Sequence, residues 1–302
     1  MAKRQSGIRK RQNEPDMQQL VVTQHYTYKN AKHLSTILFI VSVFIPSTIN
    51  IALYFNLNDL YIGMLATISV CLLFLADYIS IQIDKIKKKA AMIQQKFDLY
   101  VFNLDIDTII DDNTIAEQIE KYSKKDWYRK ANWYSNYESM DIDKAVFYSQ
   151  KENIDWTGNI AKRYRNFLVC ISFIALLAFI FNLVINNSSV IKMLSIVLAA
   201  LPLVSYAKTG YNKIKIDDEN LNEIKRFADE VKNNIDILSS ENLTNKIYIL
   251  QITLYKFRQE KYLVPDWFEN RYHKQLQAVE NRKAGQRTQK EKKRSRKNLK
   301  EK

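Results

Sequence analysis

The stretch KKDWYRKANWYS, Lys124–Ser135, places two Trp-Tyr pairs six positions apart among five charged side chains. The chain holds four tryptophans, and Trp127 and Trp133 both lie in this stretch. Large rings beside positive charge can anchor a protein at a membrane surface, fill a small core, or stack on a nucleobase. The residue types leave all three uses open, so the elements around the stretch must decide between them.

Motifs of known catalytic and metal sites are absent from the sequence. The chain contains no GxxxxGK[ST], GxGxxG or GxSxG motif. His25, His33 and His273 are too scattered in sequence to indicate a zinc cluster. Cys71 and Cys170 both lie in apolar runs, where we interpret them as small hydrophobic residues. We therefore expect a protein that is not an enzyme and that carries no cofactor and no metal.

Four apolar runs are long enough to cross a bilayer. An α-helix rises about 1.5 Å per residue, so about 18 apolar residues match the thickness of the hydrocarbon layer. The second run is interrupted by Asp77 and the fourth by Lys192, whereas the other two carry no charge. A soluble helix usually keeps a polar face, which these runs lack. They predict an all-α membrane protein, and they cover residues 34–55, 60–83, 167–185 and 190–207.

The connections within each pair of runs predict two antiparallel hairpins. Only Asn56–Asp59 joins the first two runs, and only Asn186–Ser189 joins the last two. Lysine and arginine flank the opposite ends of all four runs, while these short connections carry only the charge of Asp59. By the positive-inside rule, both termini and both long segments lie in the cytoplasm.

The first apolar run carries a polar stripe. Pro46 lies in mid-run and releases the backbone carbonyl of Ser42, and Asn50 lies one turn beyond on the same face. With Ser35, these residues form a kinked stripe that either binds helices together or lines a wet passage. Asp77 lies near the cytoplasmic end of the second run, where snorkelling to the interface is the alternative to an ion pathway. The candidate pore-lining residues are Ser35, Ser42, Pro46, Asn50 and Asp77.

The segments outside the runs have helical patterns. Thr114 and Glu117 have the spacing of a capping box, which predicts a helix that opens at Thr114. Apolar residues recur at spacings of three and four from Leu221 to Leu238, which predicts one amphipathic helix. A second helix is expected from about Leu243 to Tyr262. With five glycines and four prolines in all, little of the chain favours strands.

The expected architecture is four transmembrane helices as two hairpins with a helical cytoplasmic domain. Six segments follow from this interpretation: a basic N-terminal end with an amphipathic helix (1–33), the first hairpin (34–83), a helical segment (84–166), the second hairpin (167–207), another helical segment (208–280) and a basic disordered tail (281–302).

The net charge of +14 belongs to the two ends of the chain. Residues 1–11 carry five Lys or Arg and no acid, and residues 281–302 carry a surplus of nine, so residues 12–280 are neutral overall. A basic tail beside a membrane binds anionic lipid by about 1 kcal/mol per residue near the surface. We favour this lipid contact over nucleic-acid binding.

Five stretches around the four runs resemble a known family. They are RQNEPDMQQLVVTQHYTYKNAKH (11–33), IQQKFDLYVFNLDID (93–107), KKDWYRKANWYS (124–135), YSQKENIDWTGNIAKRYRNF (148–167) and RQEKYLVPDWFENRYHK (258–274). Their order, their spacing and the two-hairpin layout are similar to the SMODS-associated four-transmembrane effectors, a bacterial family of proposed pore-formers. The resemblance extends over residues 9 to about 280. Arg129 departs from it, because Pro would be expected after Asp-Trp-Tyr.

Such families are associated with anti-phage systems in which a nucleotidyltransferase makes a cyclic oligonucleotide on infection. The resemblance implies messenger sensing, homo-oligomerisation and a pore in the bacterial inner membrane. A cyclic di- or oligonucleotide offers phosphates to Arg and Lys and bases to aromatic rings. The candidate ligand-binding residues are Trp127, Tyr128, Arg129, Trp133, Tyr134, Trp156, Lys162 and Arg163.

Two functions remain open at this point. One is a messenger-gated pore in the lipid bilayer, and the other is a non-conducting membrane scaffold whose cytoplasmic helices dock a partner protein. Each candidate aromatic residue also has a structural interpretation, above all Trp156. KKDWYRKANWYS lies more than 40 residues after the second run, so it forms either a corner of the helical core or a stacking platform for a ligand.

Overall fold

The computed structural model describes residues 7–55, 57–125, 131–185 and 190–272, with 275, 278–279, 282–283, 285–287 and 289; the side chains of residues 156–159 and 161 are excepted. The helices of the described chain are α1 (Ile8–Gln12), α2 (Pro15–Phe39), the π-helix η1 (Ile40–Phe44), α3 (Ile45–Tyr54), α4 (Asp59–Phe102), α5 (Asp112–Tyr122), α6 (Ile142–Ile185), α7 (Val190–Asn234) and α8 (Ser240–Glu260).

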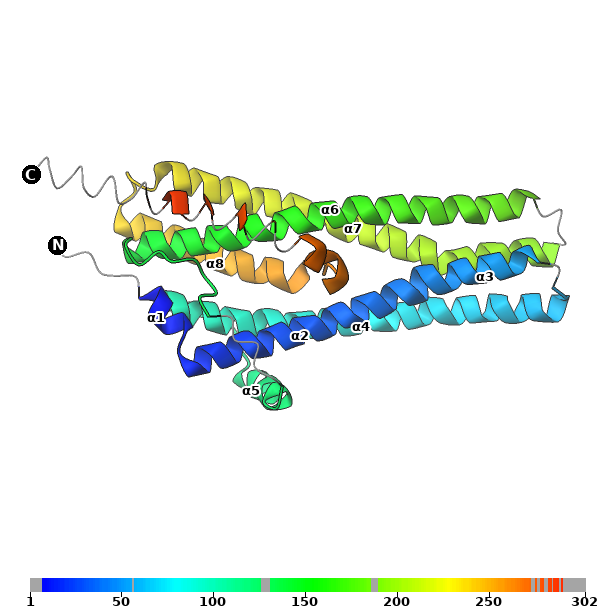
Figure 1. Ribbon diagram of the computed structural model, residues 1–302, viewed down its shortest axis with the longest axis horizontal. Coiled ribbons are helices and arrows are strands. Elements are labelled where there is room, and N and C mark those ends of the chain that lie inside the picture. Colours follow the sequence, from blue (N-terminus) through cyan, green and yellow to red (C-terminus); the bar gives the residue numbers. More distant parts are fainter. Residues whose placement is uncertain are drawn as a thin grey trace, which may run out of the picture.

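The long helices form an elongated bundle (Figure 1). At one end of the bundle α3 ends and α4 begins, and α6 ends and α7 begins at this same end. Helices α1 and α8 lie at the other end. Asn58 is the N-cap of α4, and its side chain accepts a hydrogen bond from the backbone N–H of Tyr61 at 3.1 Å. Among the described residues, four helices are long and apolar enough to cross a membrane. The predicted all-α fold with two hairpins is confirmed.

Pro46 interrupts the first membrane-crossing helix as predicted. Between α2 and α3 the chain forms the π-helical turn η1. Proline cannot donate to the carbonyl of Ser42 and its ring crowds that carbonyl, so a widened turn accommodates it. Ser42 is fully buried, and its Oγ has no hydrogen-bond partner among the described residues. The polar stripe therefore faces into the bundle at a local irregularity of the helix.

Two helical predictions differ from the structure in detail. The helix that contains Thr114 starts at Asp112, because Asp111 accepts hydrogen bonds from the N–H groups of Asn113 and Thr114. The expected capping box at Thr114 is therefore wrong, although the helix itself is confirmed. The amphipathic stretch from Leu221 is no separate helix either, because it continues α7 without a break from the fourth apolar run.

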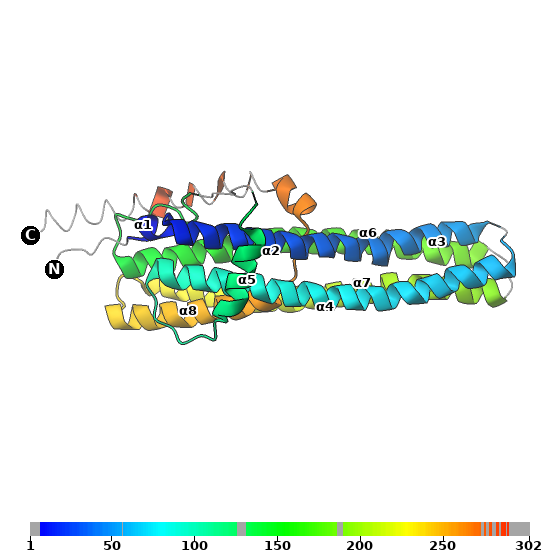
Figure 2. The ribbon, with the colours of Figure 1, turned by 90° about the horizontal axis from the view of Figure 1, so that it is seen from below.

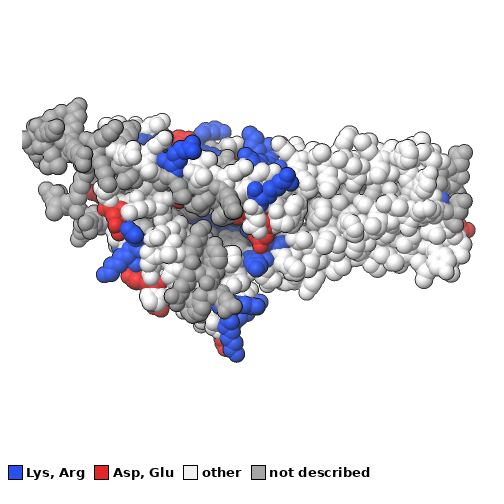
Figure 3. All heavy atoms as spheres, in the orientation of Figure 1, with Lys and Arg blue, Asp and Glu red and all other residues white. Residues whose placement is uncertain are grey.

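Two hydrophobic clusters divide the bundle along its length. The charged-half cluster joins α1, α2, α4, α5, α6, α7 and α8, with Phe97, Phe147 and Leu250 at its centre. The apolar-half cluster joins the membrane-crossing parts and contains Leu53 and Leu203. Figure 2 shows that the long helices run through both parts. On the face in Figure 3, Lys, Arg, Asp and Glu cover the half that contains α8, and the other half is almost free of charge.

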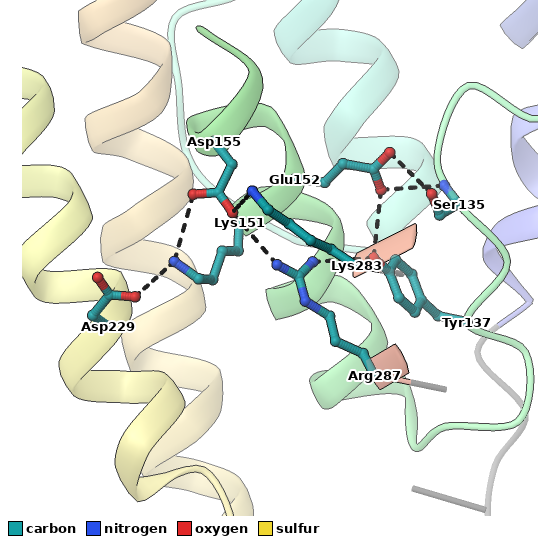
Figure 4. Close-up of polar contacts among 8 residues, drawn as sticks. All are labelled: Ser135, Tyr137, Lys151, Glu152, Asp155, Asp229, Lys283 and Arg287. Atoms are coloured by element: carbon teal, nitrogen blue, oxygen red, sulfur yellow. Dashed lines mark hydrogen bonds and ion pairs between the residues drawn. The ribbon is translucent and has the colours of Figure 1, made fainter. Parts of the chain in front are cut away.

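The start of the basic tail is helical and contacts α6. Lys283 Nζ and Arg287 Nη2 lie 3.5 and 3.4 Å from Asp155 Oδ2 (Figure 4). The Arg287 guanidinium also lies 5.4 Å from the ring centroid of Tyr148. Asp155 lies near Lys151 as well, at 3.7 Å. Lys283 and Arg287 thus contact a partly buried carboxylate, whereas the disordered tail expected from residue 281 stays a prediction.

Candidate ligand-binding cavity

A cavity of about 510 Å³ lies where the two hydrophobic clusters meet. Leu254 and Phe257 of its lining belong to the charged-half cluster, whereas Ile160 and Val264 belong to the apolar-half cluster. The lining comes from α2, α4, α6, α7, α8, the chain between α5 and α6, and the chain that follows α8. Its volume lies within the roughly 300–1,000 Å³ of small-molecule sites. A ligand bound here would contact both clusters at once.

Four basic side chains line this cavity: Lys29, Lys32, Arg258 and Lys261. Lys32 Nζ lies 2.9 Å from Asp266 Oδ1 and 2.5 Å from Glu269 Oε2. Lys261 Nζ lies 5.5 Å from the ring centroid of Tyr28. Burial, with the positive charges of Arg258 and Lys32 nearby, lowers the pKa of Lys261 to about 8. The ammonium of Lys261 would therefore gain from an anion placed beside it.

Behind the cavity, Arg258 anchors a buried polar network. Its Nη1 donates to Asp98 Oδ2 at 2.6 Å, and the hydroxyl of Tyr134 donates to Asp98 Oδ1 at 2.5 Å. Gln251 Nε2 donates to Asp98 Oδ2 and to the side-chain oxygen of Gln95. Burial opposes the charge of Arg258, but the Asp98 carboxylate outweighs it and raises the pKa of Arg258. Burial and the same carboxylate raise the pKa of Tyr134, so its hydroxyl stays a donor.

Three side chains of the lining have buried polar atoms with no partner among the described residues. They are Gln24 Oε1, Tyr28 OH and Arg258 Nη2. A buried donor or acceptor without a partner costs about 1–3 kcal/mol, so such atoms are usually satisfied by a ligand or an ordered water. Their concentration at one cavity indicates a site that binds polar groups. No group of three or more His, Cys, Asp or Glu with metal-site geometry occurs within the described chain.

Trp133 and Tyr134 differ in burial and in the rings that they contact. Tyr134 is 1% exposed and packs on Phe102 and Phe97, at 4.9 and 6.2 Å between ring centroids. Trp133 is partly buried, contacts Phe97 edge-on, and lines the cavity. Tyr134 is thus part of the core as well as of the cavity wall, and Trp133 is the less buried of the two rings. This part of KKDWYRKANWYS serves both as a core corner and as a cavity wall.

Comparison with known proteins places the chain in a family. A family model described as the SMODS-associating 4TM effector domain matches residues 6–286. The chain belongs to this family. It is also 26% identical over 247 residues to a probable CBASS effector molecule of Bacillus cereus strain VD146, covering 72% of this chain and 82% of the relative. No solved structure matches the chain.

Two other expected ligand residues of this 4TM effector lie outside the lining of the cavity. Lys162 and Arg163 are exposed on α6 and do not belong to its lining, and Arg163 lies over the ring of Tyr272, 4.6 Å from its centroid. Trp127, Tyr128 and Arg129 lie outside the described residues, as does the side chain of Trp156. Their predicted role in ligand binding stays a prediction.

Sequence reasoning missed the basic residues that do line the cavity. Lys29 and Lys32 come from α2, and Arg258 and Lys261 come from the end of α8, more than 220 residues later along the chain. The available signal was the family resemblance, because both pairs lie in the stretches 11–33 and 258–274 that carry it. Helical packing brings these two stretches together.

The candidate pore-lining residues of the 4TM effector divide into two groups. Ser35, Ser42, Pro46 and Asn50 are all buried in the bundle. Asn182 on α6 donates to the side-chain oxygen of Asn50 at 2.8 Å and to its backbone carbonyl at 2.6 Å. Asp77 is exposed on the outside of α4, so one chain does not bring it together with the other four. A shared lining that includes Asp77 would need a second chain.

Proposed function

We propose that this 4TM effector senses a cyclic di- or oligonucleotide messenger and oligomerises to permeabilise the bacterial inner membrane in anti-phage defence. Membership of the effector family supports the proposal, as does the relative named a probable CBASS effector molecule. Abortive infection is the outcome that loss of the membrane barrier would bring. The cavity gives the proposal its site.

The position of the cavity between the two clusters carries the proposal. A ligand shifts a conformational equilibrium only when it binds one state better than the other. A molecule that contacts Phe257 and Val264 together touches both clusters, so its binding depends on how they are placed. Phosphates can pair with Lys29 and Lys261, and a base can stack on Trp133.

The predicted orientation in the membrane is consistent with a ligand that comes from the cytoplasm. The basic residues that flank the four spans lie on the same side as the cavity, which the positive-inside rule places in the cytoplasm. Both termini are then cytoplasmic. A messenger made in the cytoplasm would reach the cavity without crossing the bilayer.

Permeabilisation requires a change from the structure described here. Ser42, Asn50 and Asn182 are almost fully buried, so packed side chains fill the interior of the four spans. A conducting path must therefore open within this bundle or form between chains. Homo-oligomerisation provides the second route, because the outward faces of the spans expose Phe44, Phe74, Phe173 and Phe181.

Co-expression with an active cyclic-nucleotide synthase tests the proposal. We expect membrane potential to collapse and growth to arrest, with both effects lost when the synthase is inactive. Unchanged potential, with the protein verified in the membrane, would contradict the pore and favour the non-conducting scaffold.

The binding site is tested by substitution in the same cells. Trp133→Ala should suppress the response, and Trp127→Ala extends the test to the neighbouring Trp-Tyr pair. Tyr211→Ala is the matched control, because Tyr211 is an aromatic residue that is 52% exposed and lies outside the cavity lining. Equal ligand affinity in Trp133→Ala and the control would rule out the stacking role.

A further inference from the structure

The cavity already contains the groups that would compete with an anionic ligand. Lys32 contacts Asp266 and Glu269 at 2.9 and 2.5 Å, so its charge is paired within the chain. The two acids belong to the strap, which we define as residues 261–272. An anion can use Lys32 fully only if these carboxylates withdraw, because together they already offset its charge.

The strap belongs to the apolar-half cluster. Leu263, Val264 and Phe268 are buried in it, although α8 just before the strap packs in the charged-half cluster. The hydroxyls of Tyr262 and Tyr206 lie 3.1 Å apart, which ties the strap to α7. The chain thus crosses from one cluster to the other at the cavity.

Aromatic contacts also join the strap to α6. Phe268 lies 5.1 Å from Tyr164 and 5.6 Å from Phe167, measured between ring centroids. Tyr164 lies just before the third apolar run and Phe167 begins it, and Tyr206 lies one residue before the end of the fourth. Movement of the strap would therefore alter the packing at the ends of two spans.

Residues 266–272 of the strap form a short helix, and few backbone hydrogen bonds hold the non-helical part before it in place. The N–H of Tyr262 donates to the Asp217 carboxylate, and the N–H groups of Phe268 and Glu269 donate to the carbonyl of Pro265. Residues 262–265 are not helical. A segment tied by side-chain pairs and a few hydrogen bonds opens at lower cost than the helices beside it.

We propose that the strap is an autoinhibitory element. Asp266 and Glu269 occupy the position at Lys32 that a ligand phosphate takes, and the ligand displaces them, which loosens the strap from α6 and α7. The inference rests on the proposed function for the identity of the ligand. The competition for Lys32 is a property of this chain and can be tested without that ligand.

Hydrogen–deuterium exchange of the full chain in lipid nanodiscs tests the proposal without ligand. In Asp266→Asn/Glu269→Gln, and separately in Lys32→Met, we expect strap amides to exchange about tenfold faster, because the pairs that close the strap are lost. Amides of α8 should keep their protection. The control Asp112→Asn removes an exposed carboxylate that pairs with Lys96 and should leave the strap unchanged.

Inorganic pyrophosphate is the probe for the competition. Millimolar pyrophosphate should speed exchange of the strap in the wild-type chain but not in Lys32→Met, with sodium chloride of equal ionic strength as the control. Unchanged strap exchange in the variants, or in pyrophosphate, would overturn the proposal, as would faster exchange throughout α8, which indicates general unfolding.

Ion leakage from vesicles separates this proposal from the proposed function. Faster strap exchange without leakage in any variant supports the strap and contradicts the pore. Messenger-dependent leakage with unchanged strap exchange supports the pore and overturns the strap.

Discussion

The two halves of the bundle bury polar groups in different ways. In the charged half, the ion pair of Asp98 and Arg258 lies in a network with Tyr134 and buried glutamines. In the apolar half, Asn50 and Asn182 form an uncharged amide pair. On the face in Figure 3 the surfaces are reversed, since charged side chains gather on the half with the buried ion pair and are almost absent from the other.

This difference reflects the separate requirements of ligand recognition and of a membrane environment. A buried ion pair fixes geometry, but only where further hydrogen bonds satisfy both ions. A helix interface within lipid is held instead by close packing and modest hydrogen bonds between neutral side chains. The cavity lies between these two regions, so its two walls are held by different kinds of contact.

The largest effect should follow from breaking the charged-half network. Asp98→Asn leaves Arg258 buried without a counter-charge, and we expect it to destabilise the protein by about 3–5 kcal/mol. Urea unfolding of the full chain in nanodiscs, followed by tyrosine and tryptophan fluorescence, measures the loss. The control Asp112→Asn breaks an exposed pair and should cost about 0–1 kcal/mol.

A double substitution sharpens this test. Asp98→Leu/Arg258→Met removes both charges, so it should cost much less than Asp98→Asn, because no buried charge is left unpaired. If the double variant is the less stable one, the network contributes through its hydrogen bonds to Tyr134 and Gln251 more than through charge.

Most of the fold was predictable from sequence because local features impose it. Apolar runs of span length with short connections permit little except hairpins, and Pro46 cannot continue a regular helix. The exceptions are also local. Asp111 caps α5 in place of Thr114, and nothing between the fourth span and Leu221 stops a helix, so α7 continues.

The candidate site was only partly predictable, because it depends on packing between distant segments. Trp133 was identified by its type and by the charges around it. Lys32 and Arg258 lie far apart in sequence and meet only when α2 packs near the end of α8. Lys162 and Arg163 had the right chemistry, but they lie on an exposed face of α6.

The next largest effect separates the ligand-facing ring from its core neighbour. Trp133→Ala should weaken binding of the messenger by about 10–100-fold, since a stacked base contributes about 1–3 kcal/mol. Tyr134→Phe should leave that affinity unchanged yet lower stability by about 1.5–3 kcal/mol, because it removes a hydrogen bond to a buried carboxylate. Titration calorimetry and urea unfolding measure the two quantities. Equal losses of affinity in both variants would mean that Tyr134 also binds the ligand.

A pH titration tests the cavity through Lys261. Its pKa of about 8 lies below the usual 10.5, and the charges that face it are Arg258, Lys32, Glu269 and Asp217. An anion binds the protonated form, so affinity should fall about tenfold between pH 7 and pH 9. The folded state holds this proton less tightly than the unfolded state, so the contribution of Lys261 to stability rises from about pH 8 to 10.5. Lys261→Met should flatten both profiles, and persistence of the slopes would assign them to other groups.

The smallest effect is expected within the apolar half. Asn182→Leu keeps the side chain similar in size but removes both hydrogen bonds to Asn50, at a cost of about 0.6–2 kcal/mol. Unfolding in mixed detergent micelles measures it, with Phe181→Leu as the control, because Phe181 is 61% exposed and would contact lipid before and after substitution. A loss as large as that in Asp98→Asn would remove the distinction between the halves. The polar stripe would then hold the spans together as firmly as the ion pair holds the charged half, and opening a path along Asn50 would require a correspondingly larger contribution from ligand binding.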